Sequence, residues 1–292
     1  MSAGAPFLNA ALGGRSNSAA QWHAYLEAFH DEQPDANEIF TLLRTPQGLT
    51  SYEMVARTAR ATGKNVLDVG CGDGNLADAF HDSGVQYTGI DIAEHQIAIA
   101  RNRYARETSM HFECGDVRAL PYDDERFDTV VSHQFLNLIS DPEPVLREIA
   151  RVLQPRGRLL VVANRGWTSD RENSWIYLDQ AARAAVVAAY PDFVWPSMGD
   201  RRIHSERGIV ELFGSCEAFD IETLTVGEFT PGAFMTPEQL AAMYNRLYVY
   251  GSIPNRAPIL EAVASRAREL ADGRNLVEID LPFRLINIAK RA

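Results

Sequence analysis

A glycine-rich turn between a short apolar run and a helical pattern constrains this chain more than any other feature. Residues 64–75 read KNVLDVGCGDGN, with glycine at positions 70, 72 and 74. An apolar run that ends in glycines and gives way to helical periodicity is typical of a strand, a tight loop and a helix. Glycine accepts backbone angles that other residues resist, and it lets a ligand approach the main chain closely. The turn therefore predicts a binding site for a small molecule.

The spacing of these glycines argues against a dinucleotide ligand. A dinucleotide-binding fold uses G-x-G-x-x-G, with the pyrophosphate at the helix N-terminus, whereas this loop reads G-x-G-x-G and an acid, Asp68, lies inside the strand. A second predicted strand, residues 86–90, ends in Asp91, whose carboxylate could accept hydrogen bonds from both hydroxyls of a ribose. A third predicted strand, residues 110–114, is followed by Gly-Asp-Val at 115–117.

This combination of motifs resembles the class I S-adenosylmethionine-dependent methyltransferases, and the resemblance covers residues 64–163. In that family the glycine loop holds the methionyl end of the cofactor, the acid after the second strand binds the ribose, and the acid after the third strand meets the adenine amino group. The resemblance thus gives the ribose to Asp91 and the adenine to Asp116, while Asp68 orients the loop or the cofactor's amino group. The expected cofactor-binding residues are Asp68, Gly70, Cys71, Gly72, Gly74, Asn75, Asp91, Ile92, Asp116, Val117 and His133.

Several of these residues also have a purely structural interpretation. Asp91 could cap the helix that follows it, and Asp116 could stabilise a turn. Cys71 could be a small, inert residue, and we expect no nucleophile there. The position of Asp91 directly after the second strand favours ribose binding.

Strand and helix patterns alternate through the rest of the core, which predicts an α/β fold with a parallel sheet covered on both faces. In the family that the chain resembles, the last two strands form a hairpin and the final strand runs antiparallel. Here those strands are expected at residues 219–226 and 276–289, and the second is either a strand pair or one long bulged strand, because Pro282 interrupts it. The resemblance implies a Rossmann-like, seven-stranded, mostly parallel sheet with an antiparallel final strand, an N-terminal helix and a helical cap.

We expect additions to this core in the N-terminal residues and in two insertions. We expect residues 1–48 to hold a flexible segment and a lid helix, or alternatively a helix that only packs on the core. Residues 49–292 are expected to form the methyltransferase domain, with cap insertions at about 165–215 and 230–272; insertions of this length usually build a lid or a subunit contact. The expected apolar face of the N-terminal helix consists of Trp22, Tyr25, Leu26 and Phe29.

Methyl transfer from a sulfonium is an in-line displacement, so the nucleophile, the methyl carbon and the sulfur must be aligned. An alcohol, phenol or carbon acid must also lose a proton. His133 is the first candidate for the base, because it directly follows the predicted fourth strand, residues 127–132, at the carboxyl edge where such folds place ligands. The alternative is that His133 bonds only the cofactor or its own loop. Tyr25 is the second catalytic candidate, and the sequence does not rank His23, His204 and Tyr177 against it.

The expected acceptor is a small, partly apolar or aromatic metabolite of the kind made in natural-product biosynthesis. The core resembles the ubiquinone and menaquinone C-methyltransferases, and residues 132–135 read Ser-His-Gln-Phe rather than Asn-Pro-Pro-Tyr, which argues against amides and exocyclic amines. An aromatic acceptor follows only if the cap aromatics line its pocket instead of packing on one another: Trp167, Trp175, Tyr177, Tyr244 and Tyr248. The alternatives are a tRNA or protein methyltransferase, and a cyclase or regulator that binds S-adenosylmethionine without transferring its methyl group.

The composition limits the kinds of partner that we expect the protein to bind. A formal net charge of −11 over 292 residues disfavours nucleic acid and anionic membrane surfaces. Three widely spaced cysteines without a C-x-x-C pair indicate neither a disulfide framework nor a zinc site, and we expect no metal. The first residues do not read as a signal peptide, and no apolar run approaches the roughly 18 residues of a membrane span. We therefore expect a cytoplasmic enzyme with a small-molecule acceptor; a homo-oligomer stays open.

Overall fold

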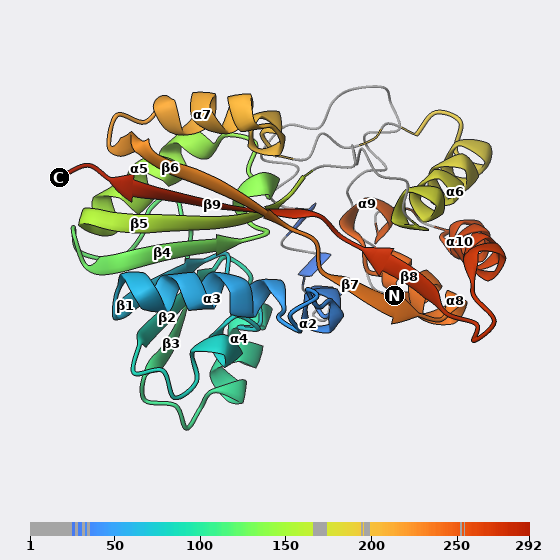
Figure 1. Ribbon diagram of the computed structural model, residues 1–292, viewed down its shortest axis with the longest axis horizontal. Helices are drawn as coiled ribbons and strands as arrows, with labels where there is room; N and C mark the ends of the chain where they lie inside the picture. The colour runs from blue at the N-terminus through green and yellow to red at the C-terminus, as the bar shows by residue number, and fades with distance from the viewer. Residues whose placement is uncertain are drawn as a thin grey trace. The chain divides into compact units, whose positions relative to one another are not determined.

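The computed structural model describes most of the chain, and Figure 1 shows the elements. The described residues are 25–26, 29–30, 33, 36–165, 174–193, 195, 199–251, 253 and 255–292. They fall into two compact units. The first lies within 1–44, 167–197 and 230–281, and the second within 45–166, 198–229 and 282–292. The predicted roles of residues 1–48 as a lid and of the two insertions as a cap stay predictions.

The second unit is built on a seven-stranded sheet with the strand order β3-β2-β1-β4-β5-β9-β6. Its strands are β1 Asn65–Val69, β2 Gln86–Asp91, β3 Met110–Cys114, β4 Phe127–His133, β5 Leu153–Asn164, β6 Phe219–Phe229 and β9 Phe283–Lys290. The strands β3, β2, β1, β4 and β5 pair in parallel, whereas β9 lies antiparallel between β5 and β6 (Figure 1). The predicted fold class is confirmed.

The strand order reverses at β1, because β2 pairs with one side of it and β4 with the other. In open α/β sheets, ligands bind outside the carboxyl ends of the strands at such a reversal. The glycine loop follows β1 at this point, so the topology puts the loop where a ligand is expected.

Helices cover the sheet on both faces. The α-helices of the second unit are α3 Ser51–Thr62, α4 Glu94–Arg103, α5 Pro142–Val152 and α7 Glu206–Gly214. Its short 3-10 helices are η2 Ala77–Phe80, η3 Leu136–Leu138 and η4 Arg201–His204. A capping box begins α3: Thr50 Oγ1 accepts from the N–H of Glu53, and Glu53 Oε2 accepts from the N–H of Thr50. The helix expected directly after the glycine loop is only η2, since the chain turns back at Asp82 and Gly84, both with positive φ, to enter β2.

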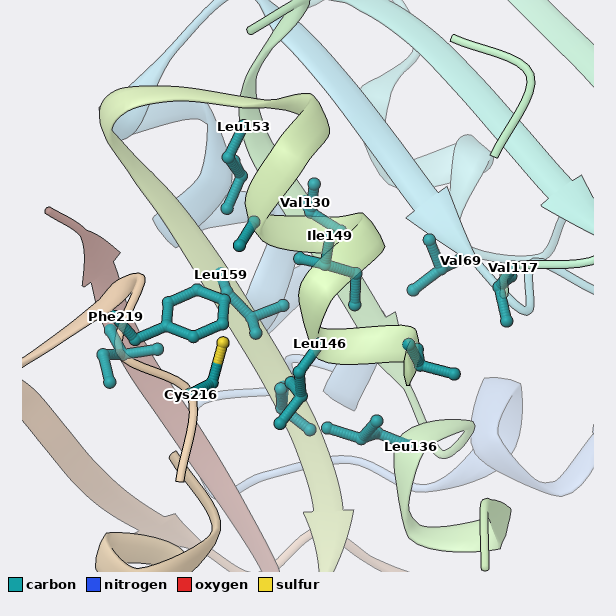
Figure 2. Close-up of a cluster of buried hydrophobic side chains, with 14 of the residues drawn as sticks. Val69, Val117, Val130, Leu136, Leu146, Ile149, Leu153, Leu159, Cys216 and Phe219 are labelled. Atoms are coloured by element: carbon teal, nitrogen blue, oxygen red, sulfur yellow. The ribbon is translucent and has the colours of Figure 1, made fainter. Parts of the chain in front are cut away.

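A hydrophobic cluster joins α5 and α7 to one face of the sheet. Figure 2 shows Leu146 and Ile149 of α5 beside Leu159 of β5 and Phe219 of β6, and all four are almost completely buried. Burying a side chain of this size contributes roughly 1.5 to 3 kcal/mol. Alternate residues of β5 point to the opposite face, and α3 packs there against β4 and β5.

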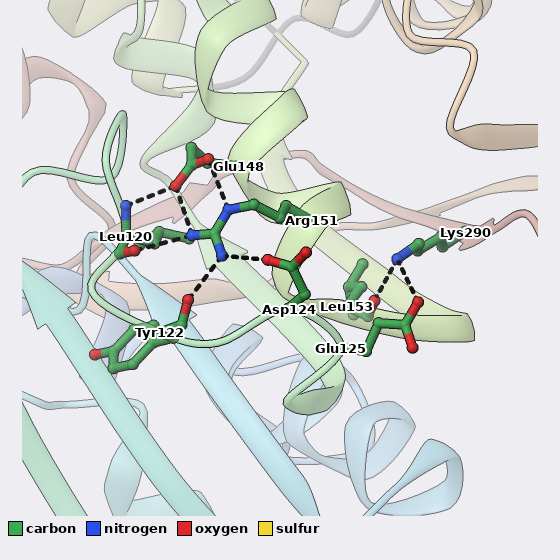
Figure 3. A network of polar contacts seen from close by, with 8 residues as sticks. All are labelled: Leu120, Tyr122, Asp124, Glu125, Glu148, Arg151, Leu153 and Lys290. Atoms are coloured by element: carbon green, nitrogen blue, oxygen red, sulfur yellow. Dashed lines mark hydrogen bonds and ion pairs between the residues drawn. The ribbon is translucent and has the colours of Figure 1, made fainter.

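A polar network anchors the segment between β3 and β4 to α5 (Figure 3). The guanidinium of Arg151 donates to the carbonyl oxygens of Leu120 and Tyr122 at 2.9 and 2.7 Å and forms ion pairs with Glu148 and Asp124. Glu148 also accepts from the N–H of Leu120 at 2.8 Å, and its bond to Arg151, the largest cause, lowers the pKa of the Glu148 carboxyl. This network holds in place the segment that begins with Asp116.

The first unit is mostly helical. Its helices are α2 Ile39–Leu42, α6 Ser174–Ala189, α8 Pro237–Asn245, α9 Tyr248–Gly251 and α10 Ala257–Leu270, and α10 packs against both α6 and α8. A two-stranded antiparallel sheet joins β7 Gly232–Met235 to β8 Val277–Asp280. Of the two alternatives for residues 276–289, the strand pair is the one observed, and its strands, β8 and β9, lie in different sheets. None of the described helices combines the length and apolarity needed to span a membrane.

Candidate functional site

The glycine loop leaves β1 in a conformation that requires glycine. Gly70, Gly72 and Gly74 have φ angles of 73°, 54° and 83°, a region that side-chain-bearing residues rarely adopt. A Cβ atom at Gly70 would lie 2.2 Å from Cγ of Phe135, so the backbone and this ring approach too closely for any other residue. The N–H groups of Gly70 and Cys71 both donate to the carbonyl oxygen of Ile90, at 2.8 and 3.2 Å, which ties the loop to β2.

Asp91 connects this loop to the start of α4. Its Oδ2 accepts from the N–H of Gly72 at 2.9 Å, and its Oδ1 accepts from the N–H of Ala93 at 2.9 Å. Asp91 is not the N-cap residue of α4, since that position is Ala93. A carboxylate offers about four acceptor positions, so each oxygen can accept a further bond. Two hydroxyls of a ribose match this remaining capacity.

Asp68 is a buried acid beside the loop, with 2% of its surface exposed. The hydroxyl of Tyr87 in β2 donates to Oδ2 of Asp68 at 2.5 Å, while Oδ1 is buried and has no hydrogen-bond partner among the described residues. Burial and the nearby Asp91 raise the pKa of the Asp68 carboxyl to about 7, although the bond from Tyr87 lowers it. A buried acceptor without a partner is costly, so a cationic or hydrogen-bond-donating group of a ligand fits at Oδ1.

Cys71 and Asn75 hold the loop rather than offering reactive groups. Cys71 is buried, and its Sγ would lie 2.8 Å from a Cβ atom at Gly89, so the thiol packs on β2. Burial, followed by the charge of Asp91, raises the pKa of this thiol well above its usual value. The Asn75 amide donates to Asp73 at 2.6 Å and accepts from Arg103 of α4 at 2.8 Å. These contacts brace the loop against α4.

The segment after β3 brings Asp116 to the surface. Its carboxylate accepts from the N–H, Nε and Nη2 of Arg118, at distances of 2.6 to 3.0 Å. These bonds match the turn interpretation, and the adenine role of Asp116 stays a prediction. Val117 is buried in the hydrophobic cluster, whereas Ile92 is 45% exposed. Of the two apolar residues predicted to meet the cofactor, Ile92 presents the accessible side chain.

His133 ends β4 on the face covered by α3. Its Nε2 lies 2.8 Å from Oγ of Ser51, the first residue of α3, and its ring centre lies 4.2 Å from that of Tyr52. Burial lowers the pKa of the imidazole to about 3, so His133 is neutral at pH 7 and a weak base there. The base role of His133 stays a prediction that this environment does not favour. His204, another candidate, places Nδ1 3.3 Å from the carbonyl oxygen of Asn164.

The remaining predicted residues lie in the first unit or outside the described residues. Tyr25 is buried, and its hydroxyl donates to the carbonyl oxygen of Tyr248. The rings of Trp175 and Tyr244 lie 5.3 Å apart and are 5% and 0% exposed, so these two aromatics pack within the unit. Tyr177 lies against the guanidinium of Arg266. The residues outside the described part are Trp22, His23 and Trp167.

The sequence interpretation missed three contacts that shape the site: the bond from Tyr87 to Asp68, the ring of Phe135 against Gly70, and the bond between Ser51 and His133. Tyr87 offered a signal, because a phenol inside a buried strand usually has a hydrogen-bond partner. No group of three or more residues able to hold a metal ion occurs in the described parts of the chain.

A comparison with known protein families agrees with the sheet, the glycine loop and the acids found here. Residues 67–161 match a family described as "Methyltransferase domain". This segment is a class I methyltransferase domain. The match confirms the predicted family, whose cofactor is S-adenosylmethionine.

Relatives and solved structures extend this comparison. The ubiquinone biosynthesis O-methyltransferase of Coxiella burnetii is 35% identical over 98 residues, which are 33% of this chain and 42% of that protein. Methyltransferase GfsG of Streptomyces halstedii is 32% identical over 143 residues, 47% of this chain and 51% of that protein. The chain thus spans about half the length, or less, of these curated relatives.

Two solved structures have a similar fold. The YcgJ protein of Bacillus subtilis superposes with a TM-score of 0.54 at 20% identity, covering 83% of this chain and 98% of that one. The cyclase SpnF superposes with a TM-score of 0.54 at 19% identity, covering 95% of this chain and 97% of that one.

Proposed function

We propose that the protein transfers a methyl group from S-adenosylmethionine to a small, partly apolar or aromatic metabolite. The observation that carries this proposal is the cradle formed by three positive-φ glycines and Asp91. The N–H groups of Gly72 and Ala93 each donate to one oxygen of the Asp91 carboxylate, and each oxygen can accept a further hydrogen bond. S-adenosylmethionine, when bound, supplies the activated methyl group.

Each part of the cofactor has a candidate partner in the methyltransferase domain. Asp91 would accept from the ribose hydroxyls, and Asp116 would accept from the adenine amino group beside the exposed side chain of Ile92. The glycine loop would hold the methionyl end, where Oδ1 of Asp68, buried and without a hydrogen-bond partner in the described part of the chain, suits a cationic group. The acids near the loop also favour a positively charged ligand over a neutral one.

The names of the relatives support a small-molecule acceptor with an oxygen nucleophile. One is the ubiquinone biosynthesis O-methyltransferase already described, and another is the O-methyltransferase cnsE of Penicillium expansum, which is 35% identical over 113 residues, 37% of this chain and 41% of that protein. The net charge of −11 speaks against a nucleic-acid acceptor. The buried Trp175 and Tyr244 no longer support an aromatic acceptor, since they pack on each other.

Proton removal is the step for which the chain offers least. His133 stays the candidate base, but an imidazole with a pKa of about 3 is a weak base at neutral pH. An acidic phenol or enol needs the least help from a base. An acceptor of that class fits the environment of His133 best.

A side-by-side titration with S-adenosylmethionine, S-adenosylhomocysteine and NAD tests the cofactor. A ligand that binds the folded state raises its thermal stability, so we expect the first two to stabilise the protein and NAD to leave it unchanged. Incubation with S-adenosylmethionine and a panel of phenols and enols should then release S-adenosylhomocysteine. Stabilisation by NAD alone would contradict the proposal.

A non-methylating reaction is the second candidate. The fold similarity to the cyclase SpnF covers nearly the whole of both chains, and a chain with a weak base at His133 could use the cofactor without consuming it. Product analysis separates the two functions, because conversion of an acceptor without release of S-adenosylhomocysteine would favour the second.

A further inference from the structure

We propose that Tyr87 is a positioning residue for cofactor binding: its hydroxyl holds the carboxylate of Asp68 so that the other oxygen, Oδ1, is presented to the cationic amino group of the ligand. This inference rests on the proposed function, because that group belongs to the methionyl end of S-adenosylmethionine.

The geometry that supports this role spans two neighbouring strands. Asp68 in β1 lies opposite Gly89 of β2, and Tyr87 lies two residues earlier in β2, on the same face as Gly89. A Cβ atom at Gly89 would lie 2.8 Å from Sγ of Cys71 and 2.9 Å from the ring of Phe112, so these two side chains pack closely over the glycine. The Tyr87 hydroxyl reaches Oδ2 of Asp68 at 2.5 Å, so one oxygen is used inside the protein and Oδ1 is left.

Tyr87 itself is held rigidly. It is fully buried, and its ring packs between Phe80 of η2 and Phe112 of β3, with ring centres 5.4 and 5.8 Å away. A ring fixed on both sides cannot follow a moving partner, so the hydroxyl sets the orientation of the carboxylate. Positioning a charged group in advance lowers the cost of binding.

The groups around Asp68 determine how strongly the bond from Tyr87 affects the pKa of this carboxyl. Asp91 at the end of β2 and the Cys71 thiol in the loop face Asp68, while β4, on the other side of β1, places the uncharged Val131 opposite it. Burial and Asp91 hold the pKa of Asp68 near 7, and the Tyr87 bond opposes them. Without Tyr87, protonated Asp68 would persist to higher pH, and a protonated carboxyl attracts a cation only weakly.

The experiment is a calorimetric titration of the full chain with S-adenosylhomocysteine between pH 6 and 8.5. For a site that must be ionised, a pKa of about 7 predicts affinity about tenfold weaker at pH 6 than at pH 8. In Tyr87→Phe the midpoint should move to higher pH; a midpoint one pH unit higher makes binding about fivefold weaker than wild type at pH 7 and nearly equal at pH 8.5.

Two variants serve as controls. Tyr122→Phe removes another buried tyrosine hydroxyl, one without a hydrogen-bond partner among the described residues, and should leave the midpoint in place. Asp68→Asn keeps the shape of the side chain but cannot ionise, so its affinity should stay near the acid limit of the wild type at every pH. Any pH dependence that remains in Asp68→Asn belongs to a group other than Asp68.

The outcomes separate this inference from the proposed function. A wild-type protein that binds with a flat pH profile, or a Tyr87→Phe curve that overlays the wild type, would overturn the positioning role alone. A wild-type protein that binds at no pH would overturn the proposed function. If Tyr87→Phe does not fold, the ring 13C resonance of Tyr87 in the wild type, assigned by NMR, should titrate with the same midpoint as the affinity; a resonance that does not titrate would overturn the inference.

Discussion

The backbone N–H of Gly72 donates to Oδ2 of Asp91 across 2.9 Å, so the loop after β1 and the carboxyl end of β2 hold each other in place. The two groups come from separate strand ends that the parallel pairing brings to one edge of the sheet. A single residue thus both fixes the loop and keeps acceptor capacity for a ligand. This double use decides how variants of Asp91 should behave.

Asp91→Ala should weaken S-adenosylhomocysteine binding by about 1 to 3 kcal/mol, or about 5- to 150-fold in Kd, because charge-assisted hydrogen bonds to the ribose are lost. The N–H groups of Gly72 and Ala93 also lose their acceptor. Isothermal calorimetry measures the change. The matched control is Asp123→Ala, an exposed acid after β3, which should bind as the wild type does; wild-type affinity in Asp91→Ala would refute the ribose assignment.

Gly70→Ala should destabilise the fold as well as the site. The positive φ alone costs about 1 kcal/mol, and a Cβ atom 2.2 Å from the Phe135 ring forces a further shift worth about 1 to 3 kcal/mol. Urea unfolding measures the sum. Gly48→Ala is the comparison, since Gly48 has a φ of 81° but no atom within 4 Å of an added Cβ; equal losses in the two variants would show that the contact with Phe135 is unimportant.

His133 should make the protein less stable as the pH falls. Its pKa is about 3 in the folded state against 6.5 for the free side chain, so between these values the unfolded chain binds more protons. The His133 contribution to the free energy of unfolding therefore falls by about 1.4 kcal/mol for each pH unit below 6.5. Denaturant melts of wild type and His133→Asn at pH 7, 6 and 5 should converge or cross as the pH drops.

His95→Gln is the matched control for that series, because His95 is exposed on α4. Its stability should follow the wild type at each pH. A difference between wild type and His133→Asn that does not change with pH would mean that the imidazole is not held neutral by burial.

Cysteine alkylation tests the inert interpretation of Cys71. Cys114 is exposed, whereas Cys71 and Cys216 are buried, and burial raises the pKa of the Cys71 thiol well above its usual value. Because the thiolate is the reactive form, brief iodoacetamide treatment of the native protein at pH 8 should modify Cys114 first, as mass spectrometry of the peptides will show. Rapid labelling of Cys71 in the folded protein would contradict its packing against Gly89.

Local patterns predicted the elements that lie close together in the sequence. The strand before Gly70 and the acid at the end of β2 each depend on a few neighbouring residues, and the structure has them where expected. The prediction of a full helix after the glycine loop was wrong, because the short return of the chain to β2 leaves room only for the four residues of η2. Pro282 marked a break correctly, but the sequence could not tell that β8 and β9 join different sheets.

The candidate site also has some features that the sequence determined and others that only the tertiary structure decided. The spacing of the glycines and the placing of acids after strands were enough to identify a methyltransferase domain, because backbone conformation and strand order demand those residues locally. Tertiary structure decided which groups are charged: the pKa of Asp68 depends first on burial and then on Tyr87 and Asp91, and that of His133 depends on burial. Burial and pairing arise only when distant segments meet, so ionisation at the site follows from the folded chain and not from its motifs.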